Sequence, residues 1–174
     1  MKKNDLLTLL NKRPFETTRA ILQPMTEADF PEYLSHTAVA TAVAGSDMED
    51  LFKEKCRELL SDENTITFTI RLKKNGMYIG YFELSGLDAL PELGIDLIES
   101  HRRQGLGYEI CRSVINYLFC YSDIAVLKYK CFRINTASLR LAKKLGAVKT
   151  GEVPLFEDLQ SDDLILVIHE IRNN

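Results

Sequence analysis

The stretch "PELGIDLIESHRRQGLGYEICRSVINYLF", Pro91–Phe119, decides the fold of this chain. Its first eight residues, 91–98, predict a strand, and from Gly105 to Cys120 apolar residues recur with the spacing of one helix face. These apolar positions are Ile110, Cys111, Val114, Ile115, Leu118 and Phe119. A strand that runs through a short loop into a helix leaves the first helical N–H groups unpaired at the positive end of the helix dipole. The sequence therefore predicts a phosphate or pyrophosphate site at this loop.

The loop itself favours an anionic ligand. Gly105 and Gly107 carry no side chain that would block the approach of a ligand. Arg102 and Arg103 add positive charge at the rim.

Two nucleotide-binding loops fit these letters poorly. A Walker loop needs a lysine followed by serine or threonine after its last glycine, where Tyr108 and Glu109 stand here. A dinucleotide fingerprint needs a third glycine at the position of Ile110. A nucleotide-binding protein is the weakest of the alternatives.

The rest of the chain predicts a mixed sheet flanked by helices. The pair Asn75–Gly76, between two alternating segments, predicts a tight antiparallel hairpin. Asn135 is expected to cap the helix that follows it, and Gly146 to end it. We expect strands at 17–24, 65–72, 77–84, 91–98, 124–132, 148–153 and 163–171, and helices at 26–36, 48–60, 105–120 and 135–146. The expected class is α/β (α+β), with about seven mostly antiparallel strands and about four helices.

Composition narrows the class of protein. The chain has 174 residues, of which 45% are hydrophobic and 27% charged, so we expect a single domain at 17–174 after an N-terminal extension at 1–16. A net charge of −3 gives no general attraction for nucleic acid or acidic lipid. The apolar run Leu6–Leu10 is too short for a signal peptide or a membrane span, so we expect a cytoplasmic protein.

The four cysteines form no CxxC pair, and the three histidines are scattered. We expect reduced, mostly buried thiols and no metal site.

Several motifs together resemble one family. "RRQGLG" (Arg102–Gly107) is similar to the Q/R-x-x-G-x-G/A motif of the GNAT superfamily of N-acetyltransferases. "NTASLRLAKKLGAVKTGEV" (135–153) resembles that family's later N-x-x-S helix and the next strand. "TTRAILQPMTEADFPEYL" and "YIGYFEL" resemble the branch that includes ribosomal-protein N-terminal (alanine/serine) acetyltransferases. The likeness runs from Thr17 to the C-terminus.

The resemblance implies a GNAT-type fold and acetyl-CoA as cosubstrate, with direct attack of an amine on the thioester in a ternary complex. Backbone groups near the end of the central strand, from Gly94 to Ile98, would hold the pantetheine arm and the acetyl carbonyl. The implied cofactor-binding residues are Leu97, Ile98, Arg102, Arg103, Gln104, Gly105, Leu106, Gly107, Tyr108 and Asn135.

The family's catalytic groups carry over only in part. Glu92 is the preferred general base, acting through water, with Glu83 and Asp96 as alternatives. Many relatives carry a tyrosine seven residues after the helix asparagine, where this chain has Ala142. Ser138, three residues after Asn135, is the carried-over alternative acid.

The acceptor stays open between a protein N-terminal α-amine, which we favour, and a small amine such as an antibiotic or polyamine. The resemblance implies that residues 30–44 and 155–163 recognise the acceptor. Their neighbourhood is rich in acids, namely Glu32, Glu49, Asp50, Glu157, Asp158, Asp162 and Asp163. A non-catalytic CoA-binding module is a further alternative. We expect a monomer or a homodimer, without nucleic-acid or membrane partners.

Overall fold

The computed structural model describes residues 2–12, 15–37, 46–156 and 162–173. Within them one sheet runs in the order β1-β2-β3-β4-β5-β6-β8-β7. The strands are β1 Phe15–Glu16, β2 Ala20–Pro24, β3 Ile66–Leu72, β4 Tyr78–Ser85, β5 Glu92–Leu97, β6 Val126–Phe132, β7 Val148–Pro154 and β8 Ile165–Arg172. The helices are α1 Lys3–Lys12, α2 Phe30–His36, α4 Ser46–Ser61, α5 Leu106–Tyr121 and α6 Thr136–Lys144, with 3-10 turns η1 Glu27–Asp29, η2 Glu99–His101 and η3 Asp162–Leu164.

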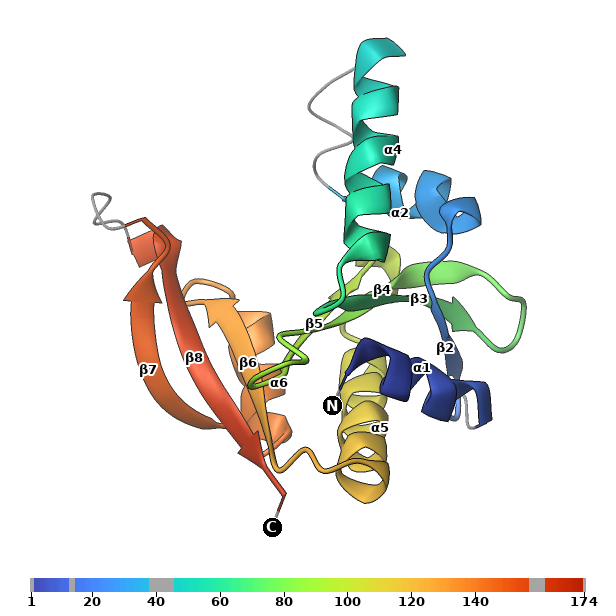
Figure 1. Cartoon of the computed structure of the whole chain (residues 1–174). Helices are drawn as coiled ribbons and strands as arrows, with labels where there is room; N and C mark the ends of the chain where they lie inside the picture. The colour runs from blue at the N-terminus through green and yellow to red at the C-terminus, as the bar shows by residue number, and fades with distance from the viewer. Residues whose placement is uncertain (1, 13–14, 38–45, 157–161, 174) are drawn as a thin grey trace.

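The expected fold class is confirmed. Every strand pair is antiparallel except β5 with β6. Figure 1 shows α1 and α5 on one side of strands β2–β5 and α2 and α4 on the other side, while β7 and β8 extend away from α4.

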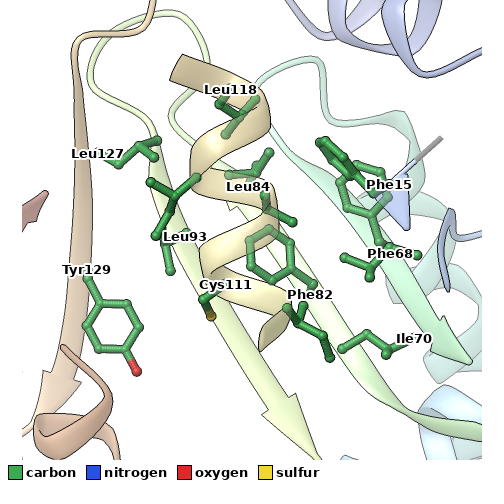
Figure 2. Close-up of a cluster of buried hydrophobic side chains, with 14 of the residues drawn as sticks. Phe15, Phe68, Ile70, Phe82, Leu84, Leu93, Cys111, Leu118, Leu127 and Tyr129 are labelled. Atoms are coloured by element: carbon green, nitrogen blue, oxygen red, sulfur yellow. The ribbon is translucent and has the colours of Figure 1, made fainter. Parts of the chain in front are cut away.

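The main core lies between the sheet and α5. The buried helix residues Ile110, Val114 and Leu118 repeat every four positions, so a single helix face meets the strands. Figure 2 shows Phe68 and Phe82 packed beside this helix. Burial of each such side chain contributes about 1.5–3 kcal/mol, so the sheet and α5 form a rigid base for the loop between them.

The expected elements are present with small shifts at their ends. Strands β3 and β4 form the expected antiparallel hairpin, but residues 73–77 connect them and Gly76 (φ 70), not Asn75, has the positive φ, so this is not a two-residue Asn-Gly turn. Gly146 has φ 79 just past α6. The expected extension at 1–16 contains helix α1, whose Leu6 and Leu10 are buried in the main core. The very short strand β1 was not expected.

None of the described helices is long and apolar enough to cross a membrane.

Candidate active site

Strands β5 and β6 separate near the middle of the sheet. They are parallel and pair only at Glu92 with Lys128 and at Leu93 with Tyr129. Beyond Leu93, β5 keeps its register with β4 up to Leu97. The side of β5 that faces β6 is therefore an open strand edge over its last four residues, and open edges offer backbone groups to a ligand.

Backbone alternation decides which groups line this edge. The Ile98 N–H donates to the Ile79 carbonyl at 2.9 Å, and the Ile98 carbonyl accepts from the His101 N–H at 2.9 Å. Both main-chain groups of Ile98 are thus used inside the protein. Since alternate residues of an antiparallel strand point to opposite neighbours, Ile95 and Leu97 face the open side. The Leu97 carbonyl already accepts from Arg102 Nε at 2.6 Å, which leaves the Leu97 N–H toward that side.

The loop after β5 leads into an N-terminus of α5 that no side chain caps. Gly105 is the N-cap residue in the left-handed region, with φ 79, and Arg103 has φ 60. Leu106 is buried in the core, whereas Gln104 and Tyr108 are exposed. The first N–H groups of α5 therefore point outward with the positive end of the helix dipole, which suits a pyrophosphate.

Arg19 holds this loop in place, a role that the sequence analysis missed. Its Nη1 donates to the Gln104 carbonyl at 3.0 Å, and its Nε lies 2.7 Å from Glu109 Oε2. Burial alone would raise the pKa of Glu109, but hydrogen bonds from Thr17 and Arg19 outweigh it and hold that pKa below its ordinary value. Arg19 and Gln104 are 85 residues apart, so no local pattern could have joined them.

The two loop arginines differ. Arg102 Nη2 lies 3.0 Å from Asp96 Oδ1, so this guanidinium ties the loop back to β5. Within the described part of the chain, Arg103 has no ion pair and is the more available cation for a phosphate. Asp96 also lies near the buried His36, whose Nε2 is 3.4 Å from Asp96 Oδ2.

The candidate carboxylates share one face of the sheet. Glu83 pairs with Gly94 and Ser85 pairs with Glu92, so the side chains of Glu83 and Glu92 are diagonal neighbours. Burial, followed by the negative charge of Glu92, raises the pKa of the Glu83 carboxyl. Lys130 Nζ lies 2.6 Å from Glu92 Oε2, an ion pair that was not expected.

Ser138 and Asn135 meet at the first turn of α6. The Asn135 side chain accepts from the Ser138 N–H at 3.0 Å, as expected of an N-cap. The Ser138 hydroxyl is hydrogen-bonded to the hydroxyl of Tyr129, which was not among the expected site residues.

The expected acceptor-recognition segments are described only in part. Residues 38–44 and 157–161, with Glu157 and Asp158, lie outside the described residues, as do the side chains of Glu49, Asp50 and Asp162. On α2, Tyr33 and His36 stack edge-on against Tyr81 of β4, with ring centroids 5.1 and 5.7 Å apart. The described part of this side is thus aromatic, and Glu32 of α2 is ion-paired with Arg71.

Comparison with known proteins gives one family. A family model described as an acetyltransferase (GNAT) domain matches residues 19–148, well over half of the chain. No curated protein sequence matches the chain significantly.

Solved structures share the fold. RimL, a ribosomal L7/L12 alpha-N-protein acetyltransferase in complex with coenzyme A, superposes with a TM-score of 0.71 at 16% identity, over 91% of this chain and 96% of that one. The ribosomal-protein-S5-alanine acetyltransferase of Vibrio fischeri gives 0.71 at 14% identity, over 92% and 97%. A spermidine N-acetyltransferase chimera of Vibrio cholerae SpeG and hSSAT gives 0.73 at 14% identity, over 89% and 96%.

Proposed function

This chain belongs to the acetyltransferase (GNAT) domain family, and we propose that it transfers the acetyl group of acetyl-CoA to the α-amine of a protein N-terminus. The family makes it an N-acetyltransferase that depends on acetyl-CoA. The acceptor is the proposed part, because structures of similar fold include both ribosomal-protein and spermidine acetyltransferases.

An exposed apolar row on the same sheet face as Glu92 is the observation that favours a polypeptide acceptor. Phe132, Leu166 and Val153 are neighbours across β6, β8 and β7. Phe132 is 37% exposed and Val153 40% exposed. Phe132 lies two residues after Lys130, the partner of Glu92, and therefore on the same face of the sheet. Apolar surface on this face suits the apolar side chains that follow an N-terminal amine, whereas a polyamine has no side chains and only short methylene segments between its charges.

The chemistry of the amine agrees with this acceptor. An α-amino group has a pKa of about 7.7–8.0 and a lysine-type amine one of about 10.4, so near pH 7 about one α-amine in ten is neutral, against fewer than about one alkylamine in a thousand. A neutral nucleophile is thus available without a strong base.

A polyamine or another small cationic amine is the second candidate. Asp96 lies beside His36 of α2, Glu83 shares its sheet face, and Glu32 is on α2. Arg102 already pairs with Asp96 and Arg71 with Glu32, so Glu83 is the carboxylate here without such an arginine among the described residues. Such carboxylates favour a multiply charged cation through complementary charge.

The residues present fit acetyl-CoA. N–H groups at the start of α5 would bind the pyrophosphate, and Arg103 would add a cation at the rim. The open edge of β5 at Ile95 and Leu97 would orient the arm and donate to the acetyl carbonyl. Bound acetyl-CoA supplies an acyl carbon joined to a thiolate leaving group. Glu92, through water, would accept the proton of the attacking amine, and Ser138 would donate a hydrogen bond to the sulfur.

A screen of acetyl transfer tests the acceptor. Thiol release from acetyl-CoA is followed with peptides that begin with alanine, serine or methionine, and with spermidine, spermine and an aminoglycoside. We expect the highest kcat/KM with a peptide. Faster transfer to spermidine than to every peptide contradicts the proposal. Tight coenzyme A binding without any acceptor-dependent thiol release indicates a binding module.

Glu92→Gln is expected to lower kcat/KM for the best acceptor by at least about tenfold, and most at the acidic end of a profile from about pH 6 to about pH 9. The loss grows toward acid because the neutral amine is then scarce and a proton acceptor matters most. The measurement is the pH profile of kcat/KM in the parent and the variant.

Glu83→Gln is the matched control, since Glu83 is the other carboxylate on this face. The charge of Glu92 raises the pKa of Glu83, so Glu92→Gln lowers that pKa. If Glu83 were the base, Glu92→Gln would move the acidic limb of the profile to lower pH, and Glu83→Gln would cause the large loss. That pair of results would assign the base to Glu83 instead.

A further inference from the structure

A buried phenol stands behind Ser138. Tyr129 is only 2% exposed, and its hydroxyl is hydrogen-bonded to the hydroxyl of Ser138 on the first turn of α6. Tyr129 pairs with Leu93 at the last position before β5 and β6 separate. Figure 2 shows its ring on β6 at the edge of the core, with the hydroxyl turned away from Leu127. This side chain thus spans from the open end of the strand pair to α6.

Neighbouring groups fix both members of this pair. The ring of Tyr129 lies edge-on to that of His169, with centroids 6.4 Å apart, and the two residues pair across β6 and β8. Asn135 Oδ1 holds the Ser138 N–H at 3.0 Å. Burial raises the pKa of Tyr129 to about 12, so the phenol keeps its proton at physiological pH. When the phenol donates to Ser138 Oγ, the serine O–H is left to donate to another acceptor. Burial raises the pKa of the Cys131 thiol and a hydrogen bond with Ser138 lowers it, so the sulfur of coenzyme A would compete with Cys131 for this donor.

We propose that Tyr129 is a positioning residue, which holds Ser138 so that the serine O–H donates a hydrogen bond to the thiolate of coenzyme A as it departs. The inference rests on the proposed role of Ser138 and takes it one residue further, to a group that does not itself touch the cofactor. Serial hydrogen bonds polarise one another, so the Tyr129 donation makes Ser138 a stronger donor.

The bonds, electrons and protons of the acetyl transfer balance when Ser138 and Tyr129 act only as hydrogen-bond donors. The acceptor nitrogen forms a bond to the acetyl carbon, the C–S bond breaks with its electron pair on sulfur, and the amine proton passes to Glu92. A thiol has a pKa of about 8.5, well below that of the Tyr129 phenol, so the proton stays on oxygen. Ser138 and Tyr129 stabilise the thiolate without protonating it, and the sulfur takes a proton from water after release.

The test is a titration of the coenzyme A thiol in its binary complex with the protein, followed by thiolate absorbance. In the parent, the pKa of the bound thiol is expected to lie below its free value of about 8.5. Tyr129→Phe should bring it back toward that value. The same variant should lower kcat about fivefold, with the KM for acetyl-CoA changed less than about twofold.

Ser138→Ala and the double variant of Ser138 and Tyr129 test the same hydrogen bond by removing the serine hydroxyl. With Ser138 absent, Tyr129→Phe should change neither the thiol pKa nor kcat any further. Tyr117→Phe is the matched control, because it removes a hydroxyl that donates to the Leu9 carbonyl, away from β6. It should leave the thiol titration unchanged.

Two results would overturn the inference. One is a bound thiol that titrates alike in the parent and in Tyr129→Phe. The other is an effect of Tyr129→Phe that is equally large with and without Ser138, which means a structural role only. The titration contains no acceptor, so its outcome stands apart from the acceptor screen: a protein that acetylates no peptide can still show the thiol shift.

Discussion

Gly107→Glu is expected to weaken coenzyme A binding by at least about a hundredfold while the domain stays folded. The new carboxylate would stand in the first turn of α5, where the pyrophosphate is proposed to bind, and like charges a few ångströms apart repel strongly at a site partly shielded from water. A glutamate in the first turn is favourable for the helix itself, because it complements the dipole. Binding and stability should therefore change independently.

Local space supports this separation. A Cβ built on Gly107 would lie 3.8 Å from Leu141 Cδ2 and 3.9 Å from Leu97 Cδ1, which is ordinary contact. Gly107→Ala should fold like the parent, and Gly107→Gln supplies the bulk of glutamate without its charge. Calorimetric titration with coenzyme A and urea unfolding are the two measurements. Affinity of the glutamate variant within about threefold of the parent would show that the loop does not hold the diphosphate.

The two loop glycines show what the sequence could and could not predict. Their spacing was enough to predict a loop that opens a helix, which the structure confirms, while its binding of an anion stays a prediction. The spacing could not tell that Gly105 is needed for its left-handed φ of 79, whereas Gly107 leaves room beside Leu97 and Leu141. The first requirement is conformational and the second is tertiary, and only the backbone separates them.

The elements predicted best are those that a short stretch of sequence determines by itself. The β3–β4 hairpin follows from one dipeptide, and α5 from a repeat within sixteen residues. Helix α1 was not predicted, because residues 1–16 were expected only as an N-terminal extension. Its Leu6 is buried by segments far along the chain, a tertiary effect that no window at the N-terminus contains.

The site residues that were missed also depend on tertiary contacts between distant parts of the chain. Arg19 reaches Gln104 across 85 positions, Lys130 pairs with Glu92 across two parallel strands, and Tyr129 meets Ser138 between a strand and a helix. Each contact depends on how elements pack, and none of these residues stands in a motif. Residue types at fixed spacing led to the groups that are proposed to bind the cofactor, but not to the residues that hold those groups in place.

Gly80→Ala is the prediction with the largest expected effect on stability, a loss of about 3 kcal/mol in the free energy of unfolding, measured by urea denaturation. A bulge at Ile79 shifts the β3–β4 register, so that Ile70 pairs with Gly80 but Arg71 pairs with Tyr78. Gly80 has φ 148, and a Cβ on it would lie 2.1 Å from the Asp96 carbonyl oxygen. Backbone cannot yield as a flexible side chain would, so β4 and β5 must move apart.

This close approach joins stability to the site. Asp96 and Leu97 are the last residues of β5, and a methyl group on Gly80 would push them out of register. Coenzyme A binding should therefore weaken about tenfold as well, because the N–H groups of the loop and of Leu97 would no longer be positioned correctly relative to one another. Gly76→Ala is the matched control: Gly76 also has a positive φ, 70, but nothing lies within 4 Å of its Cβ position. It should cost only about 1 kcal/mol and leave binding unchanged. Equal unfolding midpoints for the two variants would mean that β4 and β5 do not approach this closely in solution, and that the bulge does not shape the end of β5.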